Sequence, residues 1–471
     1  MWARGIRAGS HVAWQLPTSL EALVLAGALS RIGAVQNPIL PIYREREVGF
    51  VLRQSQARLL CVPGTFRGFD FGAMAESLAA QQPGLDVLRV DGGLPSGDAS
   101  SLPPLVEPAE SEIADELRWL FYTSGTTADP KGARHSDATL LAAARGMCQR
   151  LELDADDRIG LVFPVTHVGG VLWLMNGLLS GAAHIAVAAF DPTTSIDVLA
   201  RHGVTQATAG TVFHQAYLAA QRERGGRLFP QVRSFPGGGA PKPPQLHYDV
   251  KQELGGVGIV SGYGLTECPV LAMNSVRDAD EKLAHTEGRA CPAETEIRVV
   301  KLDDSAAAPG QEGEVRVRAP QLCQGYLDES LNAEAFDADG FFRTGDLGFL
   351  DPEGFIVITG RLKDVIIRKG ENISAKEVED LLYPHPKVAD VAVIGLPDPA
   401  SGERACAVVV AAQGAEPLSF DEMTRFLRQR GLMVQKLPEQ LELRAELPRN
   451  PTGKVRKHEL RRLYSGAEET P

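Results

Sequence analysis

The sequence predicts an α/β fold with a large N-terminal domain of several subdomains, which combines mixed sheets and helices with a β-barrel-like part, and a small α+β C-terminal domain. Short apolar runs alternate with amphipathic helical stretches, as in sheets covered by helices. Past about residue 290 the apolar residues alternate with period two, which is typical of antiparallel strands. The first 360 residues hold 30 Lys and Arg against 43 Asp and Glu, whereas residues 361–471 hold 18 against 17. This change in charge predicts domains at 1–360 and 361–471.

Each element follows from a local pattern. Helices are predicted at 19–33 and 137–151, where apolar residues recur with helical spacing. Buried strands are predicted at 58–62, 158–164, 184–190 and 256–264, and antiparallel strands at 295–304, 313–320 and 354–360. The Pro-, Ser- and acid-rich stretch 94–112 predicts a surface loop, and residues 465–471 a frayed tail. Such an order favours a mostly parallel sheet, whose ligands bind beyond the carboxyl ends of its strands.

The composition limits the classes of function. The chain has 471 residues, of which 44% are hydrophobic and 23% charged, so it is neither disordered nor fibrous. A net charge of −12 gives no global attraction to nucleic acid or to an anionic membrane surface. Residues 159–190 carry no charged side chain over 32 residues, but prolines, glycines and polar residues interrupt them. We therefore expect a buried strand, loop, helix and second strand there, and no integral membrane contact.

The cysteines indicate the compartment. The six cysteines, at 61, 148, 268, 291, 323 and 406, form no CxxC pair. This spacing predicts neither a zinc site nor a disulfide framework and fits a reducing environment. The N-terminus lacks the continuous apolar stretch of a secretory signal. A cytoplasmic location is expected.

The stretch FYTSGTTADPKG, residues 121–132, is the first motif. Hydroxyl side chains surround a glycine, and one lysine closes the loop, which together suit the oxygens of a polyphosphate. The spacing is not that of the GxxxxGK[ST] loop, because the lysine lies six residues after Gly125. An ordinary polar surface turn is the alternative. The candidate residues are Thr123, Ser124, Gly125, Thr126, Thr127 and Lys131.

Three further motifs follow along the chain. SGYGLTEC (261–268) ends an apolar strand and contains Tyr263, Gly264, Thr266 and Glu267. Its ring, hydroxyl and carboxylate are suited to bind a base, a phosphate and Mg²⁺. The alternative is a strand end followed by a helix that Thr266 caps. FRTGDLG (342–348) places Asp346 after a tight turn, and by itself this is a weak signal. LPRNPTGKVRKHEL (447–460) contains Lys454, which alone reads as part of a solvated charge run.

The joint pattern of these four motifs with GRLKD (360–364) and GENISAKEVED (370–380) resembles the adenylate-forming, or AMP-binding, superfamily of the acyl-CoA synthetase type. The resemblance covers essentially the whole chain. It implies a mobile C-terminal lid domain, with the active site between the two domains. It also implies activation of a carboxylic acid by Mg²⁺ and ATP to an acyl-adenylate, followed by transfer to coenzyme A.

The resemblance also implies site residues. Lys454, Thr266, Glu267 and His167 form the expected catalytic set, with Glu267 holding Mg²⁺ and Thr266 contacting the α-phosphate. The hydroxyl-rich loop and Lys131 bind the β- and γ-phosphates. Tyr263 and Gly264 bind adenine against Gly239, Ala240 and Pro241, and Asp346 and Arg361 bind the ribose. The acyl pocket is expected from His167, Val168, Gly169, Leu172, Gly237, Gly238 and Gly262. Lys363 maps onto the hinge and Gly370 onto the thiol tunnel.

The sequence departs from the family pattern at three places. Ala128 replaces a common glycine of the phosphate loop, and Lys369 replaces a small residue before Gly370. Met1 falls where relatives are already inside the first domain, so the chain is either naturally short or has a misassigned start. No charged partner for a second substrate group is evident, which favours a neutral, apolar medium-chain, alicyclic or aromatic monocarboxylate.

Other functions stay open from the sequence. A stand-alone adenylation enzyme that loads a carrier-protein thiol is the second interpretation. A non-catalytic nucleotide-binding protein ranks low because all the charged residues of the motifs are present. An oxidative, luciferase-like activity would need a special acyl substrate. The oligomeric state is not fixed, and a homodimer is compatible with the sequence.

Overall fold

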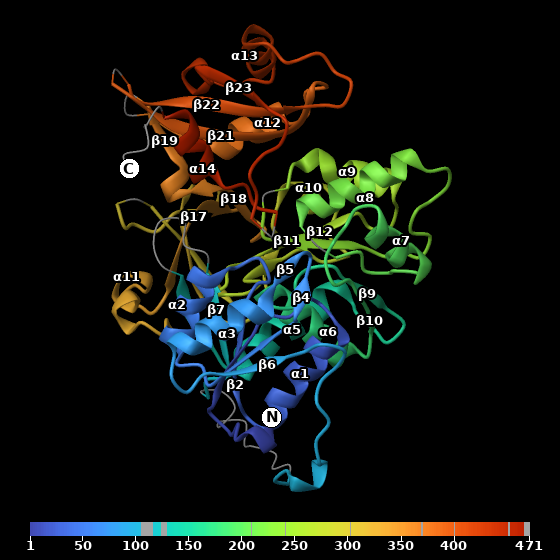
Figure 1. Cartoon of the computed structure of the whole chain (residues 1–471). Helices are drawn as coiled ribbons and strands as arrows, with labels where there is room; N and C mark the ends of the chain where they lie inside the picture. Colours follow the sequence, from blue (N-terminus) through green and yellow to red (C-terminus); the bar gives the residue numbers. More distant parts are fainter. Residues whose placement is uncertain are drawn as a thin grey trace.

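The computed structural model describes residues 1–104, 116–123, 130–208, 210–240, 242–301, 303–368, 371–399, 401–450 and 453–465. Figure 1 shows a large N-terminal part, with the C-terminal strands and helices, drawn in orange and red, gathered at one end of it. The predicted α/β fold class, with a large first part and a small second part, is confirmed. The division at residue 360 itself stays a prediction.

The first sheet carries the two ends of the hydroxyl-rich motif predicted to bind phosphate. Its strand order is β6-β3-β1-β2-β7-β8, and all its neighbours are parallel except β7 and β8. The predicted helix 19–33 is α1, which begins after Ser19, whose side chain accepts from the Ala22 amide. The strands are β1 (His11–Trp14), β2 (Val35–Pro38), β3 (Leu59–Val62), β6 (Asp86–Arg89), β7 (Trp119–Thr123) and β8 (Lys131–His135), with the hairpin β4 (Thr65–Phe66) and β5 (Phe69–Asp70). The helices are α1 (Leu20–Arg31), α2 (Glu45–Ser55), α3 (Phe71–Gln81) and α5 (Asp137–Leu151).

The uncharged stretch 159–190 forms the predicted strand, loop, helix and strand, of which β9 and most of α6 are buried whereas Leu178 at the end of α6 is 76% exposed. Strands β9 and β10 pair in parallel, and α6 lies between them in the sequence. Single bridges from Gln206 to Ile159 and Ser234 connect this pair to β11 and β12. The elements are β9 (Arg158–Leu161), α6 (Val168–Ser180), β10 (Ala183–Ala186), α7 (Thr194–Arg201), α8 (Thr211–Glu223), β11 (Phe235–Gly238), α9 (Pro244–Glu253), β12 (Ile259–Tyr263), β13 (Ala272–Met273), α10 (Asp280–His285) and β14 (Arg289–Ala290).

The period-two segments form an antiparallel sheet of order β15-β16-β17-β18, which corresponds to the predicted barrel-like part. Its strands are β15 (Glu296–Val300), β16 (Gly313–Arg318), β17 (Phe342–Leu350) and β18 (Ile356–Arg361), with the short α11 (Asn332–Ala335) between them. The 3₁₀ turn at Leu362–Asp364, which contains the predicted hinge Lys363, connects β18 to the C-terminal part.

The C-terminal part has its own sheet and core. Strands β20, β19, β22 and β21 lie in that order, and β23 pairs with β22. This part contacts the N-terminal part through the Ser374 hydroxyl, which donates to the Thr359 carbonyl over 2.5 Å. Its elements are β19 (Val365–Arg368), β20 (Glu371–Ser374), α12 (Ala375–Leu382), β21 (Val388–Asp398), β22 (Gly402–Ala411), α13 (Phe420–Gln429), β23 (Gln440–Arg444) and α14 (Lys457–Tyr464). None of the described helices of the chain has the length and apolarity needed to cross a membrane.

Candidate active site

The two ends of the hydroxyl-rich loop are held together by the β7–β8 hairpin. Thr123 and Lys131 are paired in its antiparallel register. Gly132 lies so close to the Tyr122 ring that a Cβ there would stand 2.9 Å from it, so a glycine is needed at this position. The strand pairing therefore fixes the backbone of Lys131 opposite Thr123. The remaining predicted residues of this loop, Ser124, Gly125, Thr126 and Thr127, lie outside the described residues, as does Ala128.

Glu267 lies next to this hairpin and is buried, with 8% of its surface exposed. The Tyr326 hydroxyl donates a 2.6 Å hydrogen bond to its carboxylate. The Lys131 Nζ stands 5.3 Å from the centre of the Tyr326 ring, close enough for a cation–π contact. Lys131 and Glu267, predicted for phosphate and Mg²⁺, therefore share one neighbour. Tyr326 was not predicted, since nothing near it in the sequence points to a residue 59 positions away.

A buried histidine holds the adjoining turn. Nε2 of His135 lies 2.9 Å from the Thr266 carbonyl, and its Nδ1 lies 3.0 Å from the Thr139 hydroxyl. Burial lowers the pKa of His135 to about 4, so the ring is neutral at pH 7. This contact fixes the Thr266–Glu267 turn against the end of β8. The sequence signal that was missed is His135, the histidine that ends strand β8.

Three predicted nucleotide residues meet at Asp346, which is 3% exposed. Asp346 and Arg361 are partners in the β17–β18 register, and the Arg361 Nε stands 2.7 Å from one carboxylate oxygen. The Tyr263 hydroxyl donates to the other oxygen over 2.7 Å. Burial and the negative charge of Asp346 raise the pKa of Tyr263 well above its usual range. This hydrogen bond to Asp346 fixes the Tyr263 ring at the end of β12.

Lys454 belongs to the same group of charges, although it comes from the C-terminal part. Burial and the positive charge of Arg361 lower the pKa of Lys454 to about 7, while Asp346 opposes the shift. The turn before it is closed by Asn450, whose side-chain oxygen accepts from the Lys454 amide over 2.8 Å. Gly453 packs on α8: a Cβ there would lie 2.9 Å from Cγ2 of Val212. The predicted catalytic lysine therefore lies within electrostatic range of the predicted ribose residues Asp346 and Arg361.

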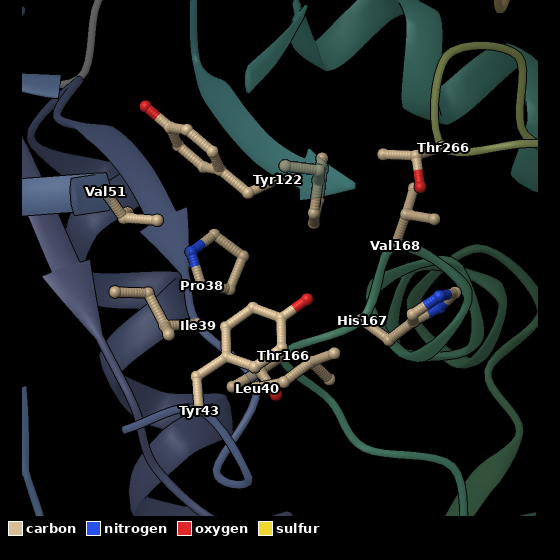
Figure 2. A pocket seen from close by; sticks show the side chains of 11 residues that line it. Pro38, Ile39, Leu40, Tyr43, Val51, Tyr122, Thr166, His167, Val168 and Thr266 are labelled. Carbon is tan, nitrogen blue, oxygen red and sulfur yellow. The ribbon is translucent and has the colours of Figure 1, made fainter. Parts of the chain in front are cut away.

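His167 and Val168 line a first cavity of about 340 Å³ together with Thr266. Figure 2 shows Tyr43 and Tyr122 on either side of Pro38 in this cavity, with His167 and Val168 on the opposite side. The remaining lining residues are Ile39, Leu40, Val51, Phe121 and Thr166. The predicted gate of the acyl site is therefore next to the predicted α-phosphate residue.

His167 also has a structural function. It is the N-cap of α6, and its Nδ1 accepts from the Gly169 amide over 3.0 Å. Burial lowers the pKa of His167 to about 4, so the imidazole is neutral near pH 7. A neutral ring that caps a helix is suited to shape the site rather than to transfer a proton at neutral pH.

Gly237 and Gly238 line a second cavity, of about 210 Å³, together with Ala240. It lies at the carboxyl ends of β11 and β12, where Gly238 comes so close to Gly262 that a Cβ would stand 2.3 Å from the Gly262 oxygen. Its polar lining consists of Thr211, His214, Lys242, Ser261 and Glu287. Lys242 and Glu287 are charged residues beside the predicted glycine wall, where the sequence interpretation found no charged partner for a substrate group.

The predicted acyl residues are thus divided between two cavities. Gly169 packs against the His167 ring, and Leu172 is buried in the main hydrophobic core, so neither lines the first or the second cavity. Gly264 faces the backbone of Val270, and Gly239 has a positive φ of 81° at the end of the glycine run. Pro241, Lys369 and Gly370 lie outside the described residues.

Two family models match the chain. The family model described as AMP-binding enzyme matches residues 1–327, and the one described as AMP-binding enzyme C-terminal domain matches residues 377–454. The chain is 34% identical to the medium-chain fatty-acid–CoA ligase of Escherichia coli (strain K12), over 98% of this chain and 82% of that protein. It is also 34% identical to the salicyl-AMP ligase / salicyl-S-ArCP synthetase of Mycobacterium tuberculosis, over 96% of this chain and 80% of that protein.

Solved structures show the same fold. The crystal structure of ATP-bound MatB from Rhodopseudomonas palustris superimposes with a TM-score of 0.88 at 28% identity, covering 99% of this chain and 90% of that one. A fatty acyl CoA synthetase of Mycobacterium tuberculosis has a TM-score of 0.70 at 30% identity, covering 98% of this chain and 89% of that one. The similarity therefore extends over both parts of the chain.

Proposed function

Because the chain belongs to the AMP-binding enzyme family, we propose that it is an AMP-forming acid–CoA ligase for a medium-chain, alicyclic or aromatic monocarboxylate. The observation that carries the proposal is that Lys454, from the C-terminal part, lies within electrostatic range of the paired Asp346 and Arg361 of β17 and β18. In this arrangement a mobile cation, Lys454, and a buried carboxylate, Asp346, lie near each other. An anionic nucleotide and an anionic acid would have to approach one another at this place.

In this proposal the nucleotide binds along the motif residues. Asp346 and Arg361 bind the ribose hydroxyls, and the Tyr263 ring stacks on adenine against Gly239, Ala240 and Pro241. Thr266 contacts the α-phosphate. Because Gly264 has no Cβ, the Tyr263–Thr266 turn can lie close to the backbone of Val270. The β- and γ-phosphates lie against Thr123, Ser124, Gly125, Thr126, Thr127 and Lys131.

The residues present fit a Mg²⁺ ion bound together with ATP. Mg²⁺ is usually held by one or two carboxylates together with phosphate oxygens and water. Glu267 supplies one buried carboxylate next to Lys131, and Tyr326 orients it through a 2.6 Å hydrogen bond. No cluster of three metal-ligating side chains occurs within the described ranges, which suits an ion whose other ligands come from the substrate. When bound, the ion neutralises phosphate charge.

The first half-reaction joins two anions. The substrate carboxylate attacks the α-phosphorus of ATP, and the bond to the β-phosphate breaks to release pyrophosphate. Lys454 in its ammonium form lies between the carboxylate and the α-phosphate and stabilises the charge that develops during transfer. Loss of one preorganised donor of this kind typically costs about 10²–10³ in rate.

The second half-reaction needs a different arrangement. The thiol of coenzyme A attacks the acyl carbonyl, and AMP leaves. We propose that the C-terminal part rotates about the 3₁₀ turn that contains Lys363, which withdraws Lys454 and brings Gly370 to the thiol route. A short connecting turn between two separately packed cores is suited to such a motion.

A carrier-protein thiol is the second candidate acceptor. The similarity to a salicyl-AMP ligase / salicyl-S-ArCP synthetase favours it, because that protein is as similar in sequence as the fatty-acid–CoA ligase. We also propose a cytoplasmic location, supported by six free cysteines. A homodimer stays a prediction that light scattering would test.

ATP–pyrophosphate exchange across a panel of carboxylic acids tests the proposed function. We expect exchange that depends on one class of monocarboxylate, and formation of acyl-CoA and AMP once coenzyme A is added. Exchange with transfer only to a phosphopantetheinylated carrier protein would favour the second candidate. A complete lack of exchange with every acid would contradict both.

A further inference from the structure

The second cavity contains more charge than an apolar acid requires. It lies where β11 and β12 end and α8 begins, beside the turn that carries Lys454, because Gly453 packs on Val212 next to its lining residue Thr211. In the proposed function the substrate carboxylate meets Lys454, so this neighbouring cavity is a candidate site for the distal atoms of the substrate. The polar groups of the cavity would then determine which distal atoms are accepted.

Lys242 is the first of these groups. It is 7% exposed, and its Nζ donates to the carbonyls of Leu283 and Ala284 over 2.9 and 2.6 Å. An ammonium has three hydrogens, so one of them stays available toward the cavity. Burial lowers the pKa of Lys242 to about 8, which leaves it mainly cationic at pH 7.

Glu287 is the matching anion. Its charge raises the pKa of Lys242, against the effect of burial, yet the two side chains form no direct ion pair with each other. The half-buried Glu287 carboxylate has neither a hydrogen bond nor an ion pair within the described residues, although its charge also raises the pKa of Lys376 in α12. A cation and an anion thus line one cavity with space between them.

His214 and Ser261 complete the polar lining. His214 is 1% exposed, and its Nε2 has no hydrogen-bond partner among the described residues. Burial is the main cause that lowers the pKa of His214 to about 3, so this ring is neutral. Ser261 offers a buried hydroxyl. An apolar group placed here would leave these polar atoms without water and without partners, which is costly.

We infer that this cavity selects an acid that carries a hydroxyl group distal to its carboxylate. A hydroxyl accepts a hydrogen bond from the Lys242 ammonium and donates one to the Glu287 carboxylate, so it bridges two groups that do not reach each other. Because one positive and one negative charge line the cavity, a neutral substituent is favoured over a second ionised group. The free space between these groups is about that of one water molecule, which suits a single hydroxyl group. The inference rests on the proposed function and refines its substrate class.

Matched pairs of acids test this inference by ATP–pyrophosphate exchange. Each pair consists of an acid and its hydroxylated form: benzoate with its 3- and 4-hydroxy derivatives, cyclohexanecarboxylate with its 4-hydroxy derivative, and hexanoate with 6-hydroxyhexanoate. We expect kcat/KM for the best hydroxylated acid to exceed that of its partner by about 100-fold, because a site built to hydrogen-bond a hydroxyl rejects the analogue that lacks it. Equal rates for the two members of every pair would overturn the inference.

The variants Glu287→Leu and Glu287→Gln complete the test. Glu287→Leu should reduce the preference for the hydroxylated acid to below about 10-fold with an unchanged KM for ATP, and Glu287→Gln, which keeps an acceptor, should retain most of it. Lys251→Met, which alters an ion pair with Asp280 outside the cavity, is the matched control. A raised KM for ATP with an unchanged acid preference would show that the cavity binds the adenine edge and would overturn the inference. Failure of every acid to support exchange would overturn the proposed function, and the inference with it.

Discussion

The side-chain amide of Gln215 donates a 2.6 Å hydrogen bond to the hydroxyl of Tyr383. Gln215 lies in α8 of the N-terminal part, and Tyr383 directly follows α12 of the C-terminal part. The same helix α8 supports the Lys454 turn through the contact between Val212 and Gly453. Two contacts on one helix therefore hold the C-terminal part in the position that brings Lys454 to Asp346.

Tyr383→Phe should slow adenylation and spare thioester formation. The substitution removes only the hydroxyl, and a hydrogen bond of this kind contributes about 0.5–1.5 kcal/mol, which corresponds to about 2- to 10-fold in rate. Single-turnover formation of acyl-adenylate measures the first step. Conversion of supplied acyl-adenylate to acyl-CoA measures the second, which should be unchanged because the contact is lost in that arrangement.

A double-mutant cycle with Gln215→Leu is the control for this prediction. If the two side chains act through their mutual contact, the double variant should be about as slow as each single variant. Additive losses, or equal losses in both half-reactions, would argue for a general effect on folding instead.

Gly453→Ala should impair adenylation more than a comparable glycine substitution elsewhere. Gly453 has a φ of +84°, and a Cβ there would lie 2.9 Å from Cγ2 of Val212. Gly431, with a φ of +85° and no atom within 4 Å of an added Cβ, is the matched control for backbone strain alone. We expect a loss of at least about 10-fold in the exchange rate for Gly453→Ala and little change for Gly431→Ala. Partial recovery in Gly453→Ala/Val212→Ala would identify the steric contact, whereas equal effects of the two glycine variants would contradict it.

His167 should prove to be a helix cap that stays neutral. His167→Ala should lower the free energy of unfolding by about 1 kcal/mol, whereas His167→Asn should retain most of it because asparagine also caps helices. A pKa of about 4 places the titration of His167 below the working range. The pH profile of adenylation by His167→Asn should therefore match the original between pH 5 and 8. The assignment of His167 as a neutral cap would be contradicted if the rate of the original protein changed with pH near 6.5 and this change were absent in His167→Asn.

Adenylation should fall as the pH rises through about 7. The ammonium form of Lys454 is the active one, and its lowered pKa of about 7 means that the free enzyme loses this proton near neutrality. Above that value kcat/KM should fall by about tenfold per pH unit, since this parameter reports the free enzyme. Lys454→Arg keeps its charge over this range and should lack the alkaline limb, while the ionisation of ATP is common to both proteins. An alkaline limb of the same shape in both would contradict the assignment.

Local patterns were sufficient for much of the fold. The predicted helix 137–151 is α5 over the same residues, because Ser136 caps it and its apolar spacing is regular. The predicted strand 256–264 shortens to β12, Ile259–Tyr263, since the glycines before it form a turn. The alternation of apolar and polar residues in 295–320 correctly predicted antiparallel strands.

The site was only partly accessible from the sequence. Tyr263, Asp346 and Arg361 could be grouped because each lies in a recognisable motif. Lys242 and Glu287 could not, because a single lysine after a glycine run and a single glutamate before Gly288 show no pattern until folding places both at one cavity. The residues predicted for the acyl pocket do not lie together for the same reason. The position of Leu172 in the core, for example, depends on the packing of α6.

Lys454→Ala, assayed in each half-reaction separately, tests the central claim most directly. The account predicts that acid-dependent ATP–pyrophosphate exchange falls by about 10²–10³, because a preorganised cation is lost from the transition state. It also predicts that supplied acyl-adenylate is still converted to acyl-CoA at the original rate. Equal loss of both half-reactions, or exchange that persists without this lysine, would contradict the account.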